Sequence, residues 1–155
     1  MSAIGGVLDR GDFILGDEVD RFEQEFAAYC GVRHAVGVDS GFSALELALR
    51  AAGIGPGDEV ITQANTFIAT VSAVLAVGAH PVLTDCDPQG AIDPAAVARA
   101  ITPRTKAIIP VHLFGRIADM EAILSIAARA RLMVLEDGPQ QMPRGAGRNP
   151  ACLLR

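Results

Sequence analysis

Hydrophobic positions along the chain change between a helical spacing and short continuous apolar runs. Between residues 17 and 31, Val19, Phe22 and Phe26 recur three and four residues apart, which is typical of one apolar helix face. Asp17 is expected to cap the start of this helix, and Gly31 suits the residue that ends it. The spacing therefore predicts a helix over 17–31.

Downstream of this helix, apolar runs alternate with longer segments of helical spacing. The runs predict strands over 34–38, 58–62, 80–85, 105–112 and 132–136. The longer segments predict helices over 43–52, over 66–77, from Pro94 behind a cap at Asp93, and over 118–131. This order predicts an α/β fold with three layers, αβα, around a mostly parallel sheet. We expect one domain over 1–141 and an unstructured tail, rich in Arg, Pro and Gly, over 142–155.

Charge and composition exclude several classes of partner. The formal net charge is −5 and no run of Lys or Arg occurs, so we expect no nucleic acid and no anionic membrane as partner. The longest apolar stretch, 67–79, is too short and too polar for a membrane span. Residues 1–16 lack the pattern of a signal peptide, and three widely spaced cysteines fit reduced thiols. These features predict a cytoplasmic protein.

Ligands in such folds bind at the carboxyl ends of the strands, and several expected strand ends carry candidate residues. Ser40, Gly41 and Ser43 form a small-residue turn before a helix, where free N–H groups suit a phosphate. An ordinary turn with Ser43 as helix cap is the alternative. Phe67 follows the next strand and fits either a surface for a planar ligand or a plain core residue.

The last predicted strand ends in Glu136 and Asp137. A carboxylate at that point projects into the crevice, where Asp137 is placed to pair with a cationic ring nitrogen. A helix cap or a surface ion pair is the alternative. Gln140 follows on the same loop, and His112 ends the preceding strand. His112 fits either a residue that reaches the crevice or a buried histidine with its hydrogen bonds satisfied.

Two further features offer other chemistry. Asp85 and Asp87 resemble the metal–diphosphate pair of a glycosyltransferase, but an Asp-Pro turn explains them better, and we expect no metal site. Lys106 is the only lysine among 13 basic residues. It begins a predicted strand at the end opposite the crevice, so we expect a solvated lysine rather than one that forms a Schiff base.

Five stretches together resemble the DegT/DnrJ/StrS sugar aminotransferases. They are HAVGVDSGFSALELAL, GIGPGDEVITQANTFIAT, GAHPVLTDCDP, AITPRTKAIIPVHLFGRIADM and VLEDGPQ, and the resemblance runs from about residue 11 to residue 141. It implies the large domain of a fold-type I enzyme that uses pyridoxal 5'-phosphate (PLP). Such enzymes transfer an amino group, usually from glutamate, to a nucleotide-linked keto-sugar or a keto-cyclitol, and they share their sites between the subunits of a homodimer.

The resemblance also implies roles for matching residues. Phe67 matches the aromatic residue that stacks on the pyridine ring, Asp137 the carboxylate that keeps the ring nitrogen protonated, and Gln140 the amide near the ring hydroxyl. The turn at 40–43 matches the phosphate loop. The full set of cofactor-binding positions is Ser40, Gly41, Phe42, Ser43, Phe67, His112, Asp137 and Gln140.

The chain departs from the family pattern at several points. Phe42 stands where the family usually has Thr, which removes a hydroxyl from the phosphate loop. After Gln141 the usual His-Gly-Ala type of sequence is replaced by Met-Pro-Arg-Gly, and the Schiff-base lysine of the family lies further downstream. We therefore expect a truncated or frameshifted chain that has no catalytic residue of its own, holds PLP weakly and is inactive alone. A catalytically dead module that pairs with a full-length paralogue, and a fragment of a PLP-dependent sugar dehydratase, are the alternatives.

Overall fold

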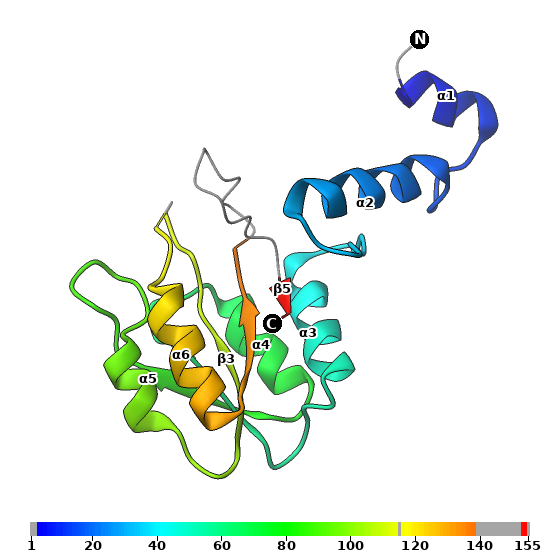
Figure 1. Ribbon diagram of the computed structural model, residues 1–155. Coiled ribbons are helices and arrows are strands. Elements are labelled where there is room, and N and C mark those ends of the chain that lie inside the picture. The colour runs from blue at the N-terminus through cyan, green and yellow to red at the C-terminus, as the bar shows by residue number, and fades with distance from the viewer. Residues whose placement is uncertain (1–2, 115, 139–152, 155) are drawn as a thin grey trace. The chain divides into compact units, whose positions relative to one another are not determined.

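The structure, a computed structural model, describes residues 3–114, 116–138 and 153–154. These residues fall into two compact units that divide between residues 38 and 39 (Figure 1). The helices are α1 (Ala3–Arg10), α2 (Asp17–Cys30), α3 (Gly41–Ala51), α4 (Ile68–Ala76), α5 (Pro94–Ala100) and α6 (Met120–Ala130). The strands are β1 (Glu59–Gln63), β2 (His80–Thr84), β3 (Thr105–Ile109), β4 (Met133–Glu136) and β5 (Leu153–Leu154).

The sheet has the strand order β2-β1-β3-β4-β5. The first four strands in this order run parallel, and β5 pairs antiparallel with β4. A parallel bridge between Val111 and Asp137 continues the pairing of β3 and β4 beyond both strands. The mostly parallel sheet predicted from the apolar runs is confirmed, and its carboxyl ends lie at one edge.

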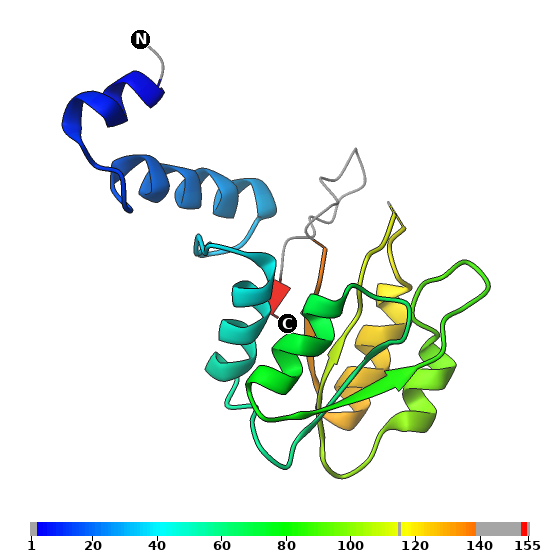
Figure 2. The same ribbon diagram turned by 180° about the vertical axis from the view of Figure 1, so that it is seen from behind.

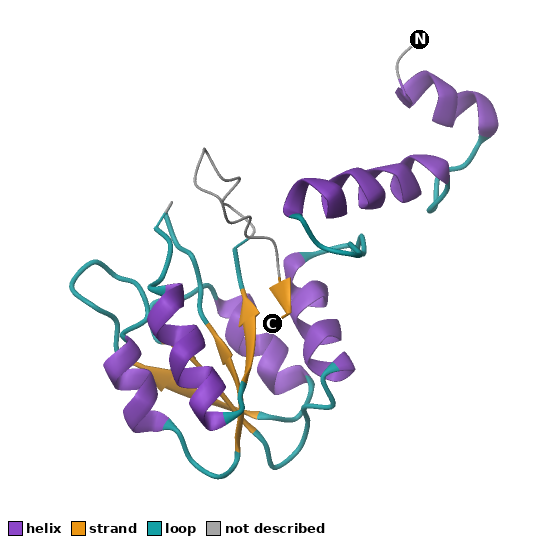
Figure 3. Cartoon of the chain, in the orientation of Figure 1, coloured by secondary structure: helices purple, strands orange, loops and turns teal. Residues whose placement is uncertain are grey.

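Successive side chains of each strand point to opposite faces of the sheet, and each face has its own apolar cluster. Val60, Ile109 and Leu135 pack with buried residues of α3 and α4. Ile61, Ile108 and Val134 pack with buried residues of α5 and α6. Figures 1 and 2 show these two helix layers from opposite sides, and Figure 3 shows the sheet between them. The three-layer αβα architecture is thus confirmed.

The unit before residue 39 corrects two predictions and contains one helix that was not predicted. Residues 34–38 form no strand: the Gly37 N–H donates to Glu23 Oε1 at 2.6 Å, and Val36 is 78% exposed, so this segment lacks the strand partner that a β-strand needs. Gly16, not Asp17, precedes α2 as its N-cap. The helix α1 was not predicted, because its two glycines disfavour a helix by propensity.

The apolar stripe of α2 exists but is not covered within this unit. The rings of Phe22 and Phe26 stack at a centroid distance of 5.5 Å, and Tyr29 lies next to them. Phe22 is nevertheless 58% exposed, and among the described residues 3–38 only Ala27 is buried. The helix predicted from the helical spacing is confirmed, and Val19 and Phe26 of its stripe are half-buried.

The predicted domain end at residue 141 lies outside the described residues. So does the tail expected over 142–155, except that Leu153–Leu154 form β5. Within the described part of the chain, no helix combines the length and the apolar character that a membrane crossing requires.

Candidate functional site

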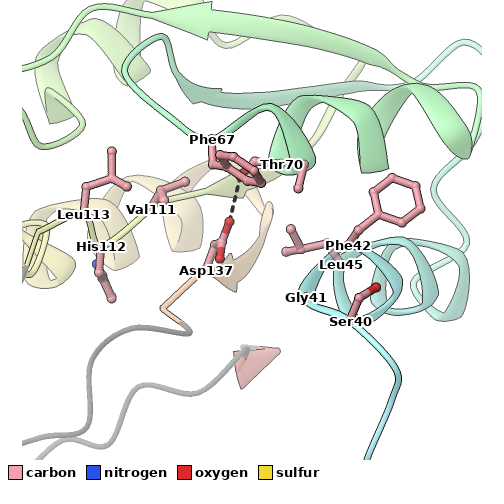
Figure 4. Close-up of a pocket in the computed structure, with 11 residues that line it drawn as sticks. Ser40, Gly41, Phe42, Leu45, Phe67, Thr70, Val111, His112, Leu113 and Asp137 are labelled. Carbon is pink, nitrogen blue, oxygen red and sulfur yellow. Dashed lines mark hydrogen bonds between the residues drawn. The ribbon is translucent and has the colours of Figure 1, made fainter.

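A cavity of about 370 Å³ lies where the carboxyl ends of β3 and β4 meet the starts of α3 and α4 (Figure 4). It is mostly apolar, with a few polar groups, and its volume is within the range of small-molecule sites, about 300–1,000 Å³. The residues that line it are Ser40, Gly41, Phe42, Leu45, Phe67, Ala69, Thr70, Val111, His112, Leu113 and Asp137.

Asp137 lies in the cavity wall directly after β4. Its backbone is fixed on both sides, because its N–H donates to the Pro110 carbonyl at 3.0 Å and its carbonyl accepts from the His112 N–H at 2.9 Å. Its side chain is buried and accepts a hydrogen bond from the Thr70 hydroxyl, Oγ1 to Oδ2, at 2.7 Å. Burial raises the pKa of Asp137, while the Thr70 hydrogen bond partly offsets that rise. A carboxylate in this position favours a cationic partner.

Phe67 also lines the cavity. It is the N-cap residue of α4 and is 70% exposed, so the alternative of a plain core residue is wrong. Thr70 follows one helical turn later, which puts both residues on the same side of the helix start. The Phe67 ring and the Asp137 carboxylate both line this cavity (Figure 4).

The turn at 40–43 opens α3 with a hydroxyl cap. Ser40 is the N-cap, and its Oγ accepts from the Ser43 N–H at 3.2 Å, so the alternative of Ser43 as cap is corrected. The N–H groups of Gly41 and Phe42 begin the helix, where α-helix geometry provides no intrahelical acceptor. A Cβ added to Gly41 would meet no atom within 4 Å, so this residue leaves open space in the cavity wall.

Phe42 and Ser43 are placed differently from the other turn residues. The Phe42 ring is partly buried against the apolar cluster under α3 and α4, although the residue also lines the cavity. Ser43 is outside the lining, and its hydroxyl lies 3.0 Å from the Ser40 hydroxyl. The structure thus brings Ser40, Gly41 and Phe42 to the cavity and leaves Ser43 behind them.

His112 satisfies both interpretations that the sequence left open. Its side chain is fully buried, yet the residue lines the cavity. Nδ1 accepts from the Ala118 N–H at 3.3 Å, so Nε2 carries the ring proton and faces Glu136 Oε2 at 3.5 Å. The imidazole is fixed in one tautomer and one orientation.

Other sequence candidates lie elsewhere. Asp87 Oδ1 accepts from the N–H groups of Gln89 and Ala91, as expected for a turn, and Asp85 is exposed. Among the described residues, no group of three or more His, Cys, Asp or Glu side chains is placed to hold a metal ion. Lys106 is exposed at the amino end of β3, away from the cavity, and Gln140 lies outside the described residues.

Thr70 is a site residue that the sequence analysis did not predict. It is buried in α4, an otherwise largely apolar helix, and lies three residues after Phe67. The signal in the sequence was a hydroxyl residue three positions after the candidate aromatic residue Phe67. The partner of the hydroxyl could not be predicted, because Asp137 is 67 residues away along the chain.

The comparisons with known proteins agree on one family. The model of the DegT/DnrJ/EryC1/StrS aminotransferase family matches residues 1–146, which extends the resemblance at both ends. The chain is 53% identical over 140 residues to a dTDP-3-amino-3,4,6-trideoxy-alpha-D-glucose transaminase of Streptomyces venezuelae. That match covers 90% of this chain and 37% of the relative, and the chain spans about two fifths of the length of the curated relatives it matches.

Solved structures support the same assignment. The chain matches DesV of S. venezuelae, solved in complex with a ketimine intermediate, with a TM-score of 0.85 and 54% identity, over 87% of this chain and 37% of that one. It also matches NtdA of Bacillus subtilis, solved with the bound cofactor PMP, with a TM-score of 0.84 and 44% identity, over 86% of this chain and 31% of that one. The fold is that of fold-type I PLP aminotransferases, and the chain belongs to the DegT/DnrJ/EryC1/StrS aminotransferase family.

Proposed function

We propose that this chain provides one wall of the PLP site of a nucleotide-sugar aminotransferase. The observation that carries the proposal is the buried Asp137 carboxylate in a cavity that faces an exposed aromatic ring. When bound, PLP supplies an electron sink for amino transfer, provided that its ring nitrogen stays protonated.

The residues present fit this cofactor. Asp137 would hold the cationic ring nitrogen, and Phe67 would cover one face of the ring. The phosphate would lie at the start of α3, where the N–H groups of Gly41 and Phe42 and the positive end of the helix dipole favour an anion. The open space beside Gly41 allows close approach to that backbone. Phe42 contributes its N–H there in place of a side-chain hydroxyl.

In this proposal the described residues bind PLP and keep its ring nitrogen protonated. The Asp137 carboxylate stabilises a proton on a nitrogen that faces it, and its burial keeps competing water away. His112, fixed in one tautomer, keeps the floor of the cavity rigid. Lys106, the single lysine of the 155 residues, is exposed at the other end of β3. We therefore expect these residues alone to bind PLP without catalysing amino transfer.

For the full-length protein we propose a nucleotide-linked keto-sugar or keto-cyclitol as amino acceptor and glutamate as amino donor. The support is the similarity to a dTDP-sugar transaminase.

The test is a PLP titration of the 155-residue chain, followed by absorbance and by isothermal calorimetry. We expect saturable binding that Asp137→Asn weakens at least about tenfold, since a charge-assisted contact is worth about 1.5–3 kcal/mol. Asp85→Asn, which removes an exposed carboxylate outside the cavity, is the matched control and should bind as the wild type does. Absence of saturable binding by the wild-type chain would refute the proposal.

A further inference from the structure

The hydrogen bond between Thr70 and Asp137 belongs to a chain of two hydroxyls. Thr66 Oγ1 lies 3.0 Å from Thr70 Oγ1, which in turn lies 2.7 Å from Asp137 Oδ2. Thr70 has one hydroxyl proton, and an ionised carboxylate only accepts hydrogen bonds. Thr70 therefore donates to Asp137, and Thr66 donates to Thr70. Both bonds point toward the carboxylate, so each strengthens the other.

This arrangement determines how Asp137 faces the cavity. The Thr70 bond engages Oδ2, which leaves Oδ1 as the other acceptor atom of the carboxylate. Thr70 is itself almost fully buried and lines the cavity beside Asp137. A hydroxyl in this place compensates for water that burial removes from the carboxylate, and it restricts rotation of the side chain.

We propose that Thr70, with Thr66 behind it, is a positioning residue that holds Asp137 charged and oriented toward a cationic ring nitrogen in the cavity. The ligand in this statement rests on the proposed function, whereas the effect of Thr70 on Asp137 does not. The direction of the effect is consistent with the pKa of Asp137, which burial raises and the Thr70 hydrogen bond lowers.

Two substitutions separate the hydroxyl of Thr70 from its packing. Thr70→Val keeps the shape of the side chain and removes the hydroxyl, while Thr70→Ser keeps the hydroxyl and removes a methyl group. The first measurement is a ¹³C NMR titration of the Asp137 carboxyl in the ligand-free chain, with Asp137→Asn to assign the signal. We expect Thr70→Val to raise the pKa of Asp137, Thr66→Val to raise it less, and Thr70→Ser to leave it close to the wild-type value.

The second measurement is PLP affinity. Thr70→Val should weaken binding about tenfold, and Thr70→Ser should retain affinity within about twofold. An unchanged Asp137 pKa in Thr70→Val, an equal rise in Thr70→Ser, or equal PLP affinity of Thr70→Val and wild type would each overturn the positioning role. Failure of the wild-type chain to bind PLP would instead remove the proposed function and the ligand, while the NMR titration still decides whether Thr70 controls Asp137.

Discussion

Glu59 and Asp137 lie at opposite ends of one parallel sheet, and the protein shifts the pKa values of their carboxyl groups in opposite directions. Glu59 begins β1 and accepts hydrogen bonds from the Thr102 hydroxyl and from Arg104. These two hydrogen bonds lower its pKa. Asp137 follows β4, where burial dominates and raises its pKa.

The hydrogen bonds that Glu59 accepts from Thr102 and Arg104 predict that the folded chain loses stability in acid. Because the pKa of Glu59 is lower in the folded chain than its ordinary value of 4.5, its contribution is present above pH 4.5 and is lost as the pH falls through the folded pKa. Glu59→Gln should therefore be less stable than wild type at pH 7, and the difference should shrink below pH 4.5. Urea unfolding at several pH values measures it, with the exposed Glu25→Gln as control. A difference that stays constant with pH would contradict this prediction.

For Asp137 we expect a pH dependence of stability opposite in sign to that of Glu59. A carboxyl whose pKa is raised on folding favours the folded state below its ordinary value of 3.8, and that contribution is lost as the pH rises through the folded pKa. Asp137→Asn keeps an acceptor for Thr70 and carries no charge. We expect this variant to be more stable than wild type at pH 7, with the advantage vanishing in acid, even though it binds PLP more weakly. Thermal melts at pH 7 and at pH 3.5 measure the difference, and a variant less stable at pH 7 would contradict it.

The sequence predicted features that depend on neighbouring residues, and it did not predict features that depend on contacts between residues far apart in the chain. The strands at 59–63 and 105–109 were predicted close to their observed bounds, because continuous apolar runs reflect burial on both faces of a sheet. The edge strand at 80–84 was also predicted, although only Thr84 in it is buried. Residues 34–38 have the same apolar character but form no strand, since a strand also requires a partner that local sequence does not reveal. The same limit applies to the site. Asp137 and Phe67 were predicted from their places in the chain, whereas the role of Thr70 depends on a contact 67 residues away.

A substitution at Phe67 should change PLP affinity without changing the stability of the fold. Its side chain is 70% exposed, so Phe67→Ala should change the free energy of unfolding by no more than about 0.5 kcal/mol. The loss of ring stacking should weaken PLP binding about three- to tenfold, since an aromatic pair contributes about 0.5–1.5 kcal/mol. Phe13 is also 70% exposed, and Phe13→Ala is the matched control for both measurements. Equal PLP affinity of the two variants would show that Phe67 does not contact the ring.

We expect exposed apolar side chains of the unit before residue 39 to make copies of the chain associate. Its exposed large apolar side chains are Ile4, Leu8, Phe13, Ile14, Leu15, Phe22, Tyr29, Val36 and Val38. Among its described residues only Ala27 is buried, so this unit has almost no core of its own. Exposed large apolar side chains that gather into one surface mark an interaction site. We expect the chain to associate reversibly, with an average mass in sedimentation velocity that rises with concentration.

Added charge tests whether this apolar surface causes the association. The double substitution Phe13→Glu and Ile14→Glu places two carboxylates where 70% and 88% of the side chains are exposed, so folding should be unaffected while association weakens. Gln24→Glu with Ala28→Glu adds the same two carboxylates at exposed positions of α2 that are not large apolar residues, and should leave association close to wild type. If both double variants dissociate equally, net charge and not the apolar surface controls the assembly. If the wild-type mass does not change with concentration, this surface does not drive self-association.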